Sequence, residues 1–254
     1  MCFYYYQNSY VILINSKIFI YKKYLGIDHY ICWRVYMRND LIIIDNPLAK
    51  YYLTILRDHR TTPKVFRDYI RRLGFILGYE ASKYLKWKKV FVETPLAKSE
   101  GLEIGKPVLI VGVLGASIPM IEGIWDALPW AGLGLVAARR HEYPDRVEVD
   151  VYYERLPEDL SIYTILLIDP MLATGKTIVK VIKKLREKKA KDIVILTIIS
   201  SKPGIEYVRR ELGNIPIITV AIDPLLNDKF FIVPGLGDAG DRGLSHDYVE
   251  EKRV

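Results

Sequence analysis

Cysteine is scarce in this sequence, and both cysteines lie near its start. Cys2 and Cys32 are the only two among 254 residues. The rest of the chain, from residue 37 onward, therefore contains neither a disulfide framework nor a cysteine-ligated metal site. We expect a cytoplasmic location, where thiols stay reduced.

The N-terminal part also lacks a long hydrophobic run. Residues 11–20 are mostly apolar, but the polar residues 15–17 interrupt them. A helix that spans a membrane needs about 20 apolar residues. No small-residue cleavage site accompanies the segment, so we predict neither a membrane span nor a signal peptide.

Acidic residues are in the minority, but the positive excess is uneven. The chain has a net charge of +7 and a pI of about 9.1. Residues 1–36 hold four basic side chains against one acidic side chain, which places +3 of the +7 there. The remaining +4 is modest, so the charge gives no reason to expect a nucleic-acid partner.

Residues 1–36 lack a sustained hydrophobic period and are rich in tyrosine. Eight of the 19 tyrosines fall there, with no repeat of 2 or 3.6 residues that would predict a strand or a helix. We predict that residues 1–36 are an N-terminal extension that is disordered or absent from the native protein, whose first residue is Met37. Residues 37–254 then form one domain. The alternative is a β-rich accessory segment or an anchor to a membrane surface.

The most informative stretch of the chain surrounds Asp169. Residues 162–168 form a bulky run without polar alternation, which is typical of a strand buried on both faces of a parallel sheet. Apolar residues recur with helical spacing in residues 178–185. Asp169 is therefore expected at the carboxyl end of a strand, before a small-residue turn that leads into a helix N-terminus. Such a turn offers backbone amides to an anion beside a carboxylate.

Runs typical of strands alternate with amphipathic helical segments over most of the chain. This alternation predicts an α/β fold with a parallel sheet, right-handed crossovers and ligands at the carboxyl ends of the strands. We expect helices from residue 51 to 57 and at 63–84, 118–128 and 204–212. Besides 162–168, we expect strands at 41–44, 90–96, 107–114, 133–138, 151–153, 192–199 and 215–222.

Several interpretations compete for residues 169–177. Gly175-Lys176-Thr177 suggests a P-loop, but that motif needs a glycine where this chain has Pro170, which lacks a backbone donor. An ordinary strand-to-helix turn capped by Thr174 is another alternative. The sequence DPMLATG at 169–175 resembles the motif with which type I phosphoribosyltransferases bind 5-phospho-α-D-ribose 1-diphosphate (PRPP), in its uracil phosphoribosyltransferase version.

A second motif near the C-terminus supports the same resemblance. Residues 231–242, FIVPGLGDAGDR, closely match the uracil-binding segment of uracil phosphoribosyltransferases, although their composition also suits a flexible surface loop. Residues 53–58, 66–67 and 77–81 resemble the N-terminal part of the same family. The resemblance spans residues 41–242 and is archaeal-like.

The resemblance implies the type I phosphoribosyltransferase fold, an α/β domain whose central parallel sheet is flanked by helices, with a small hood and a mobile β-arm at residues 143–153. It also implies pyrimidine salvage, in which uracil and PRPP give uridine 5′-monophosphate (UMP) and diphosphate. Mg²⁺ is then carried by PRPP without direct protein ligands. GTP and CTP are candidate allosteric nucleotides, and a homodimer or homotetramer is expected, with no membrane or nucleic-acid partner.

The resemblance implies roles for individual residues as well. Asp169, at the ribose hydroxyls, and Asp238, at the sugar and the base, are the expected catalytic residues. The residues expected to bind uracil are Ile232, Gly237, Asp238 and Ala239. The residues expected to bind PRPP are Asp169, Pro170, Met171, Leu172, Ala173, Thr174, Gly175, Lys176, Thr177 and Asp238, together with Arg139 and Arg140, of which one grips the diphosphate.

Three positions depart from the family. Gly115 stands where the family has an arginine that contacts PRPP, and loss of such a contact weakens binding by roughly 1.5–3 kcal/mol. Lys176 replaces a small residue of the phosphate turn, and Gly243-Leu244 replaces a Phe-Gly pair at the wall of the base pocket. These departures support a second hypothesis, a paralogue that binds nucleotides and regulates, with little turnover.

Overall fold

The computed structural model describes residues 2–6, 9–14, 17–23, 30–35, 40–142 and 147–244, and for the first four of these segments only the backbone. The chain divides into two compact units, Met1–Asp40 and Leu41–Val254. The division lies close to the boundary expected at residue 37.

The described part of the first unit is an antiparallel sheet. Its strands lie in the order β1 (Cys2–Tyr6), β2 (Ser9–Ile14), β3 (Lys17–Lys23) and β4 (Tyr30–Val35). Strands here are what the β-rich alternative expects. That residues 1–36 are absent from the native protein stays a prediction, which the intact mass of the protein from its own organism would test.

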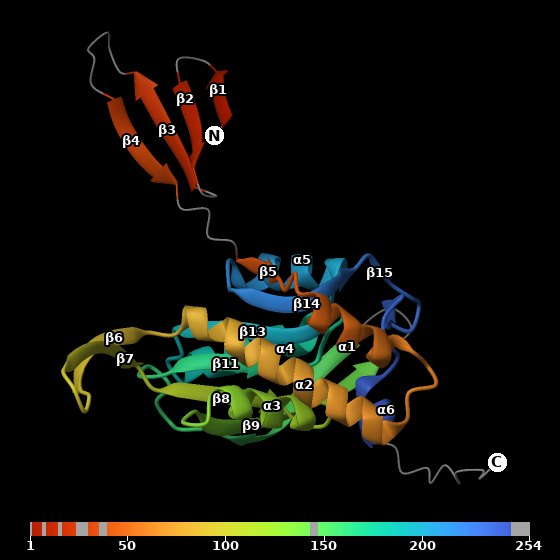
Figure 1. Ribbon diagram of the computed structural model, residues 1–254. Helices are drawn as coiled ribbons and strands as arrows, with labels where there is room; N and C mark the ends of the chain where they lie inside the picture. Colours follow the sequence, from red (N-terminus) through yellow and green to blue (C-terminus); the bar gives the residue numbers. More distant parts are fainter. Residues whose placement is uncertain are drawn as a thin grey trace. The chain divides into compact units, whose positions relative to one another are not determined.

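The second unit is built around one mostly parallel sheet (Figure 1). Its strands are β5 (Leu41–Ile43), β8 (Val108–Val113), β9 (Gly132–Glu142), β10 (Val147–Arg155), β11 (Thr164–Ile168), β12 (Met171–Leu172), β13 (Asp192–Ser201) and β14 (Ile217–Asp223). They lie in the order β10-β9-β8-β11-β13-β14-β5, and β12 pairs with β13. All pairs are parallel except β9 with β10. The predicted α/β class is confirmed.

Helices cover both faces of this sheet. One face carries α1 (Pro47–Arg57), α2 (Pro63–Ala81) and α3 (Ile118–Ala127), and the other carries α4 (Lys176–Glu187) and α5 (Lys202–Leu212). Side chains alternate along β8, so that Val108 and Ile110 join the core under α1 to α3 while Leu109 and Val111 join the core under α4 and α5. None of the helices in the described part is long and apolar enough to cross a membrane.

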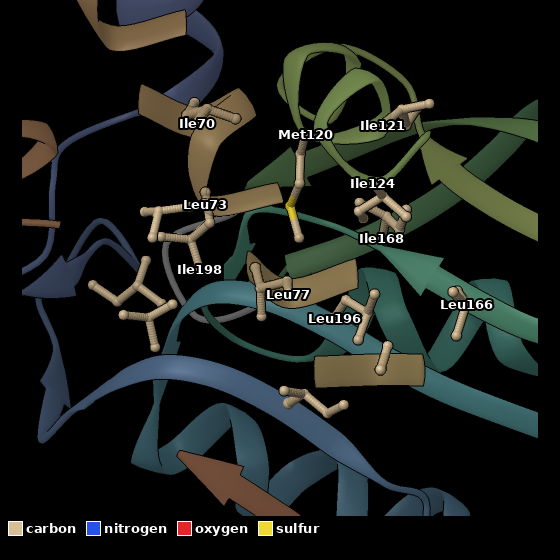
Figure 2. Packing of buried hydrophobic residues seen from close by; sticks show 14 of the residues in the cluster. Ile70, Leu73, Leu77, Met120, Ile121, Ile124, Leu166, Ile168, Leu196 and Ile198 are labelled. Atoms are coloured by element: carbon tan, nitrogen blue, oxygen red, sulfur yellow. The ribbon is translucent and has the colours of Figure 1, made fainter. Parts of the chain in front are cut away.

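The larger core brings α2 and α3 against the middle of the sheet. Figure 2 shows side chains of both helices meeting those of β11 and β13, among them Leu77, Met120 and Leu196. The two helices approach closely because α3 has a glycine at the contact. A Cβ on Gly123 would lie 1.8 Å from the carbonyl oxygen of Arg71 in α2.

The direction of the crossovers creates a crevice between β8 and β11. From β8 the chain passes through α3 to β9, toward one edge of the sheet, and from β11 it passes through α4 to β13, toward the other edge. Open α/β sheets bind ligands where the connections of neighbouring strands part in this way. The fold therefore brings residues 114–117 and 169–175 to the same end of the sheet.

Smaller elements complete the second unit. A one-turn helix (Ser82–Tyr84) follows α2, and β6 (Trp87–Glu93) and β7 (Lys98–Ile104) form an antiparallel hairpin that extends away from the sheet (Figure 1). The strand expected at 90–96 is β6, which begins and ends three residues earlier. The sequence did not predict β7, because its residues KSEGLEI have little apolar character. β15 (Leu225–Leu226) pairs with β16 (Ile232–Val233), and the short helix α6 (Ala239–Leu244) follows; the small hood stays a prediction.

The hairpin of β9 and β10 is longer than expected. The strand predicted to end at residue 138 continues to Glu142, and the strand predicted at 151–153 begins at Val147. Charged residues are tolerated at this edge, where β10 is the outermost of the described strands. Residues 143–146 lie outside the described residues, and the mobility of this arm stays a prediction.

Candidate active site

A cavity of about 240 Å³ opens at the carboxyl ends of β8 and β11, at the crevice that the crossovers create. Five parts of the described chain line it: the loop after β8, one residue of β9, the turn from β11 into α4, the segment at the start of β16, and the start of α6. The lining residues are 113–116, Ala138, Asp169, 171–175, Thr177, Ile178, 230–232 and 237–240. The two motifs found in the sequence therefore line a single cavity.

Asp169 is held at the end of β11 by the neighbouring strand. Its backbone N–H donates to the carbonyl of Leu196 in β13 at 3.2 Å, and its carboxylate accepts a hydrogen bond from the N–H of Met171 at 3.3 Å. The carbonyl of Pro170 accepts hydrogen bonds from the N–H groups of Ile198 and Ile199. Asp169 is half-buried and lines the cavity. Pro170 is not a lining residue, and its contribution is this anchoring of the turn to the sheet.

The N-terminus of α4 faces the same cavity. Gly175 is its N-cap, with a φ of 75°, and the hydroxyl of Thr174, the cap in the alternative of an ordinary turn, accepts the N–H of Lys176 at 3.4 Å. The first main-chain bond of the helix runs from Val179 N–H to Gly175. Thr177 and Ile178 line the cavity in the first turn, where helical N–H groups have no partner within the helix. A helix start of this kind suits a phosphate.

Two residues that the sequence analysis did not identify support this turn from behind. The hydroxyl of Ser201 donates to the carbonyl of Ala173 at 2.5 Å and accepts the N–H of Gly204 at 2.8 Å. A Cβ on Gly204 would lie 2.1 Å from the carbonyl oxygen of Ala173. Only glycine allows α5 to begin this close to the phosphate turn.

The C-terminal motif is an ordered wall of the cavity. Ile232, Leu236 and Ala239 are buried, with exposed fractions of 3%, 4% and 3%. The carboxylate of Asp238 accepts the N–H of Asp241 at 2.9 Å, at the start of α6. These contacts are against the interpretation of this segment as a flexible surface loop.

An ion pair from outside both motifs fixes this wall. The guanidinium of Arg57, at the end of α1, donates to both carboxylate oxygens of Asp223 at 2.8 and 2.7 Å and to the carbonyl of Gly235 at 2.8 Å. The same carboxylate accepts the N–H of Gly235 at 2.8 Å. Burial raises the pKa of Asp223, but the bonds from Arg57 and Gly235 outweigh it and hold this pKa below its ordinary value.

Arg242 joins the C-terminal motif to α1. Its guanidinium donates to the carbonyls of Leu56, of Leu236 at 2.7 Å and of Asp58 at 2.6 Å, and it lies 4.4 Å from the centre of the Phe66 ring. Burial lowers the pKa of Arg242 from its ordinary value. Arg57 and Arg242 therefore fix the loop of residues 235–237 from two directions.

A comparison with protein families agrees with this site. The family model described as Uracil phosphoribosyltransferase matches residues 43–244, which include both motifs and most of the chain. This chain belongs to the uracil phosphoribosyltransferase family.

Similar proteins extend this assignment. The uracil phosphoribosyltransferase of Aeropyrum pernix is 48% identical to this family member over 201 residues, which are 79% of this chain and 94% of the relative. The uracil phosphoribosyltransferase of Pyrobaculum islandicum is 44% identical over 206 residues, which are 80% of this chain and 98% of the relative. The structure of the AQ2163 protein from Aquifex aeolicus is 28% identical in sequence and superposes with a TM-score of 0.75. The superposition covers 82% of this chain and 99% of the AQ2163 chain. The predicted type I phosphoribosyltransferase fold and the archaeal-like resemblance are confirmed.

The departure at Gly115 has a backbone explanation in this phosphoribosyltransferase. Gly115 lines the cavity with a φ of 104°, a conformation that side-chain-bearing residues rarely adopt. No atom lies within 4 Å of the place that a Cβ would occupy. Space for a side chain exists, but the backbone of this loop is shaped for glycine.

Two of the basic residues expected at PRPP, Arg139 and Lys176, are not among the described residues that line the cavity. Arg139 is exposed on β9, its guanidinium 5.8 Å from the centre of the Tyr152 ring, and Ala138 is the lining residue of that strand. The described part of Arg140 is its backbone, which pairs with Val149. Lys176 is the first residue of α4 and is half-buried. A role of these residues in binding PRPP stays a prediction.

Aromatic residues line the cavity at another position than that of the absent Phe-Gly pair. Phe230 and Phe231 line the cavity just before Ile232, whereas Gly243 is buried in α6 near Phe66. Within the described residues, no group of three or more His, Cys, Asp or Glu side chains is arranged to hold a metal ion.

Proposed function

We propose that this protein is a uracil phosphoribosyltransferase, which joins uracil to PRPP and releases UMP and diphosphate. The observation that carries the proposal is that the two family motifs line one cavity at the switch point of the sheet. The family match and its relatives support the same activity. They give no support to the alternative of a regulator without turnover.

The turn after β11 binds the 5′-phosphate and the ribose of PRPP. Its anion-binding groups are the backbone amides of residues 173–177, at the positive end of the α4 dipole. Asp169 holds the ribose hydroxyls as an acceptor, at a position fixed by β13. The loop at Gly115 contacts the diphosphate through its backbone. Arg139 or Arg140 binds the diphosphate as well.

The C-terminal motif, residues 231–242, binds uracil. Uracil presents an acceptor, a donor and an acceptor along one edge, which main-chain groups of residues 232 and 237–239 complement. Asp238 lies on the sugar side of the base. Because Arg57, Asp223 and Arg242 hold this loop in place, the polar groups are positioned before the base arrives, which lowers the entropic cost of binding.

Mg²⁺ would be held mainly by the phosphates of PRPP, beside Asp169 and Asp238. Asp169 and Asp238 are the acidic residues among the described lining of the cavity, a donor set that suits a metal held mainly by substrate phosphates. When bound, Mg²⁺ neutralises the charge that grows on the diphosphate as it leaves. The protein residues position the two substrates and exclude water from the sugar.

The setting of the enzyme follows from the family resemblance. We propose a cytoplasmic homodimer or homotetramer, with GTP and CTP as candidate regulators. The family match begins at residue 43, and the relatives align over 94–98% of their own lengths. Both observations support residues 37–254 as the catalytic domain.

The test compares two carboxylates at opposite ends of the sheet. Asp169→Asn removes the acceptor at the cavity, and Asp192→Asn removes a carboxylate at the start of β13, where it pairs with Lys106 at 2.6 Å. We expect Asp169→Asn to lower kcat/KM for UMP formation from labelled uracil about 10- to 100-fold and Asp192→Asn to leave it unchanged. Equal rates in the wild type and Asp169→Asn would contradict the role of Asp169, and a wild type that forms no UMP would contradict the function.

A further inference from the structure

The loop between β15 and β16 is a tight turn organised by Asn227. The carbonyl of Asn227 accepts the N–H of Phe230, and its N–H donates to the carbonyl of Phe231, both at 2.9 Å. The side-chain oxygen of Asn227 accepts the N–H groups of Lys229 at 3.0 Å and of Phe231 at 2.9 Å. This is the pattern of a three-residue hairpin loop, in which a turn is followed by one residue in the left-handed conformation.

Phe230 occupies that left-handed position, with a φ of 59°. Glycine is the usual residue there, because a Cβ makes the conformation unfavourable. Within the described part of the chain, the other non-glycine residue with a positive φ is Lys189, at 67°. An aromatic residue in this conformation is uncommon, and such strain gathers at functional sites.

The position of Phe230 indicates why an aromatic residue is present. Phe230 lines the active-site cavity and is half-buried. It belongs to neither of the two hydrophobic cores of the described residues. Its apolar surface therefore faces the cavity rather than the packing of the sheet, and the turn supplies no reason of its own for a ring.

We propose that Phe230 is a base-binding residue whose ring packs against the pyrimidine ring of uracil. This inference rests on the proposed function and extends it to a residue outside both motifs. Main-chain groups at residues 232 and 237–239 complement the edge of the base, which leaves its faces to an apolar surface. Stacking of a base on an aromatic side chain is favourable. The turn around Asn227 fixes the ring in advance, so little freedom is lost on binding.

The backbone of the turn provides a clean variant. Phe230→Gly removes the ring and inserts the residue that the turn geometry prefers, so the fold is retained. Lys189→Gly is the matched control, since it makes the same backbone change at an exposed residue after α4. Phe230→Leu keeps apolar bulk without an aromatic face. Calorimetry on the full chain then measures binding of UMP, which carries the base, and of ribose 5-phosphate, which does not.

We expect Phe230→Gly to weaken UMP binding about tenfold, to leave ribose 5-phosphate binding unchanged, and to raise the KM for uracil more than the KM for PRPP. Phe230→Leu should recover part of the affinity, and Lys189→Gly should match the wild type. Unchanged UMP binding in Phe230→Gly, or equal losses for UMP and ribose 5-phosphate, would overturn the assignment. A wild type that binds UMP through this ring but forms none from uracil and PRPP would contradict the proposed function while supporting the role of Phe230.

Discussion

The ion pair of Arg57 and Asp223 lies outside both sequence motifs, and we predict that Arg57→Ala impairs stability and uracil binding together. The substitution removes two of the three N–H donors that Asp223 has in the structure, and it leaves the N–H of Gly235 as the third. It also removes the donor to the carbonyl of Gly235. A carboxylate then stays buried without its charge partner, at the base of the loop that carries the uracil site.

The magnitude follows from the burial of the two side chains. The side chain of Asp223 is 6% exposed and that of Arg57 is 26% exposed. Removing one partner of a buried pair costs about 3–5 kcal/mol. The partial exposure of Arg57 places the expected loss in the free energy of unfolding at the lower end, about 3 kcal/mol. For a chain of this size, that loss lowers Tm by roughly 6–12 °C.

Thermal unfolding and steady-state kinetics measure the two effects. The KM for uracil should rise more than the KM for PRPP, because Gly235, which Arg57 anchors, lies in the segment that binds uracil. Arg57→Lys should recover only part of both losses, since an ammonium group cannot bind both carboxylate oxygens in one plane. Arg72→Ala is the control, since it breaks an exposed pair with Asp68 and should change neither quantity. An Arg57→Ala variant with the Tm and uracil KM of the wild type would refute the reasoning.

The same pair gives the sign of a pH effect. The pKa of Asp223 is lowered in the folded protein, so the charged carboxylate stabilises the fold above its unfolded pKa of about 3.9. That contribution is lost as the pH falls through the lower, folded pKa. The difference in free energy of unfolding between the wild type and Asp223→Asn should therefore be constant from about pH 6 to 8 and shrink below about pH 4. A difference that grows on acidification would contradict it.

Three further substitutions test the phosphate side of the cavity. Gly204→Ala places a Cβ against the carbonyl of Ala173, so Tm should fall and the KM for PRPP should rise; an unchanged KM would show that the turn does not depend on α5. Lys176→Ala should raise the KM for PRPP while Lys180→Ala, one turn further along α4, leaves it unchanged, and equal values would show that Lys176 does not contact the donor. Gly115→Ala should cost roughly 1–2 kcal/mol of stability because of its positive φ, and a fully stable variant in thermal unfolding would contradict that strain.

Most of the sheet and both motifs could be predicted from the sequence, because buried parallel strands are continuous apolar runs. The run 162–168 and the helical spacing after residue 175 placed Asp169 at the end of a strand. The same rule failed at β7, whose residues are polar and mostly exposed. It failed again at residue 138, where charged residues continue β9 as part of a hairpin at the edge of the sheet.

The residues that support the site could not be predicted, because their partners are distant in the sequence. Arg57 and Asp223 are 166 residues apart, and no local pattern links them. Ser201 and Gly204 approach the phosphate turn only once β13 and β11 are paired. Phe230 resembled an ordinary apolar residue before a motif, since its positive φ is set by the turn around Asn227.

The measurement that tests the central claim most directly is phosphorus NMR of the full chain with uracil, PRPP and Mg²⁺. We expect UMP and diphosphate to appear in equal amounts, and neither to form when uracil is omitted. Tight binding of UMP without formation of either product would contradict the account and indicate a nucleotide sensor.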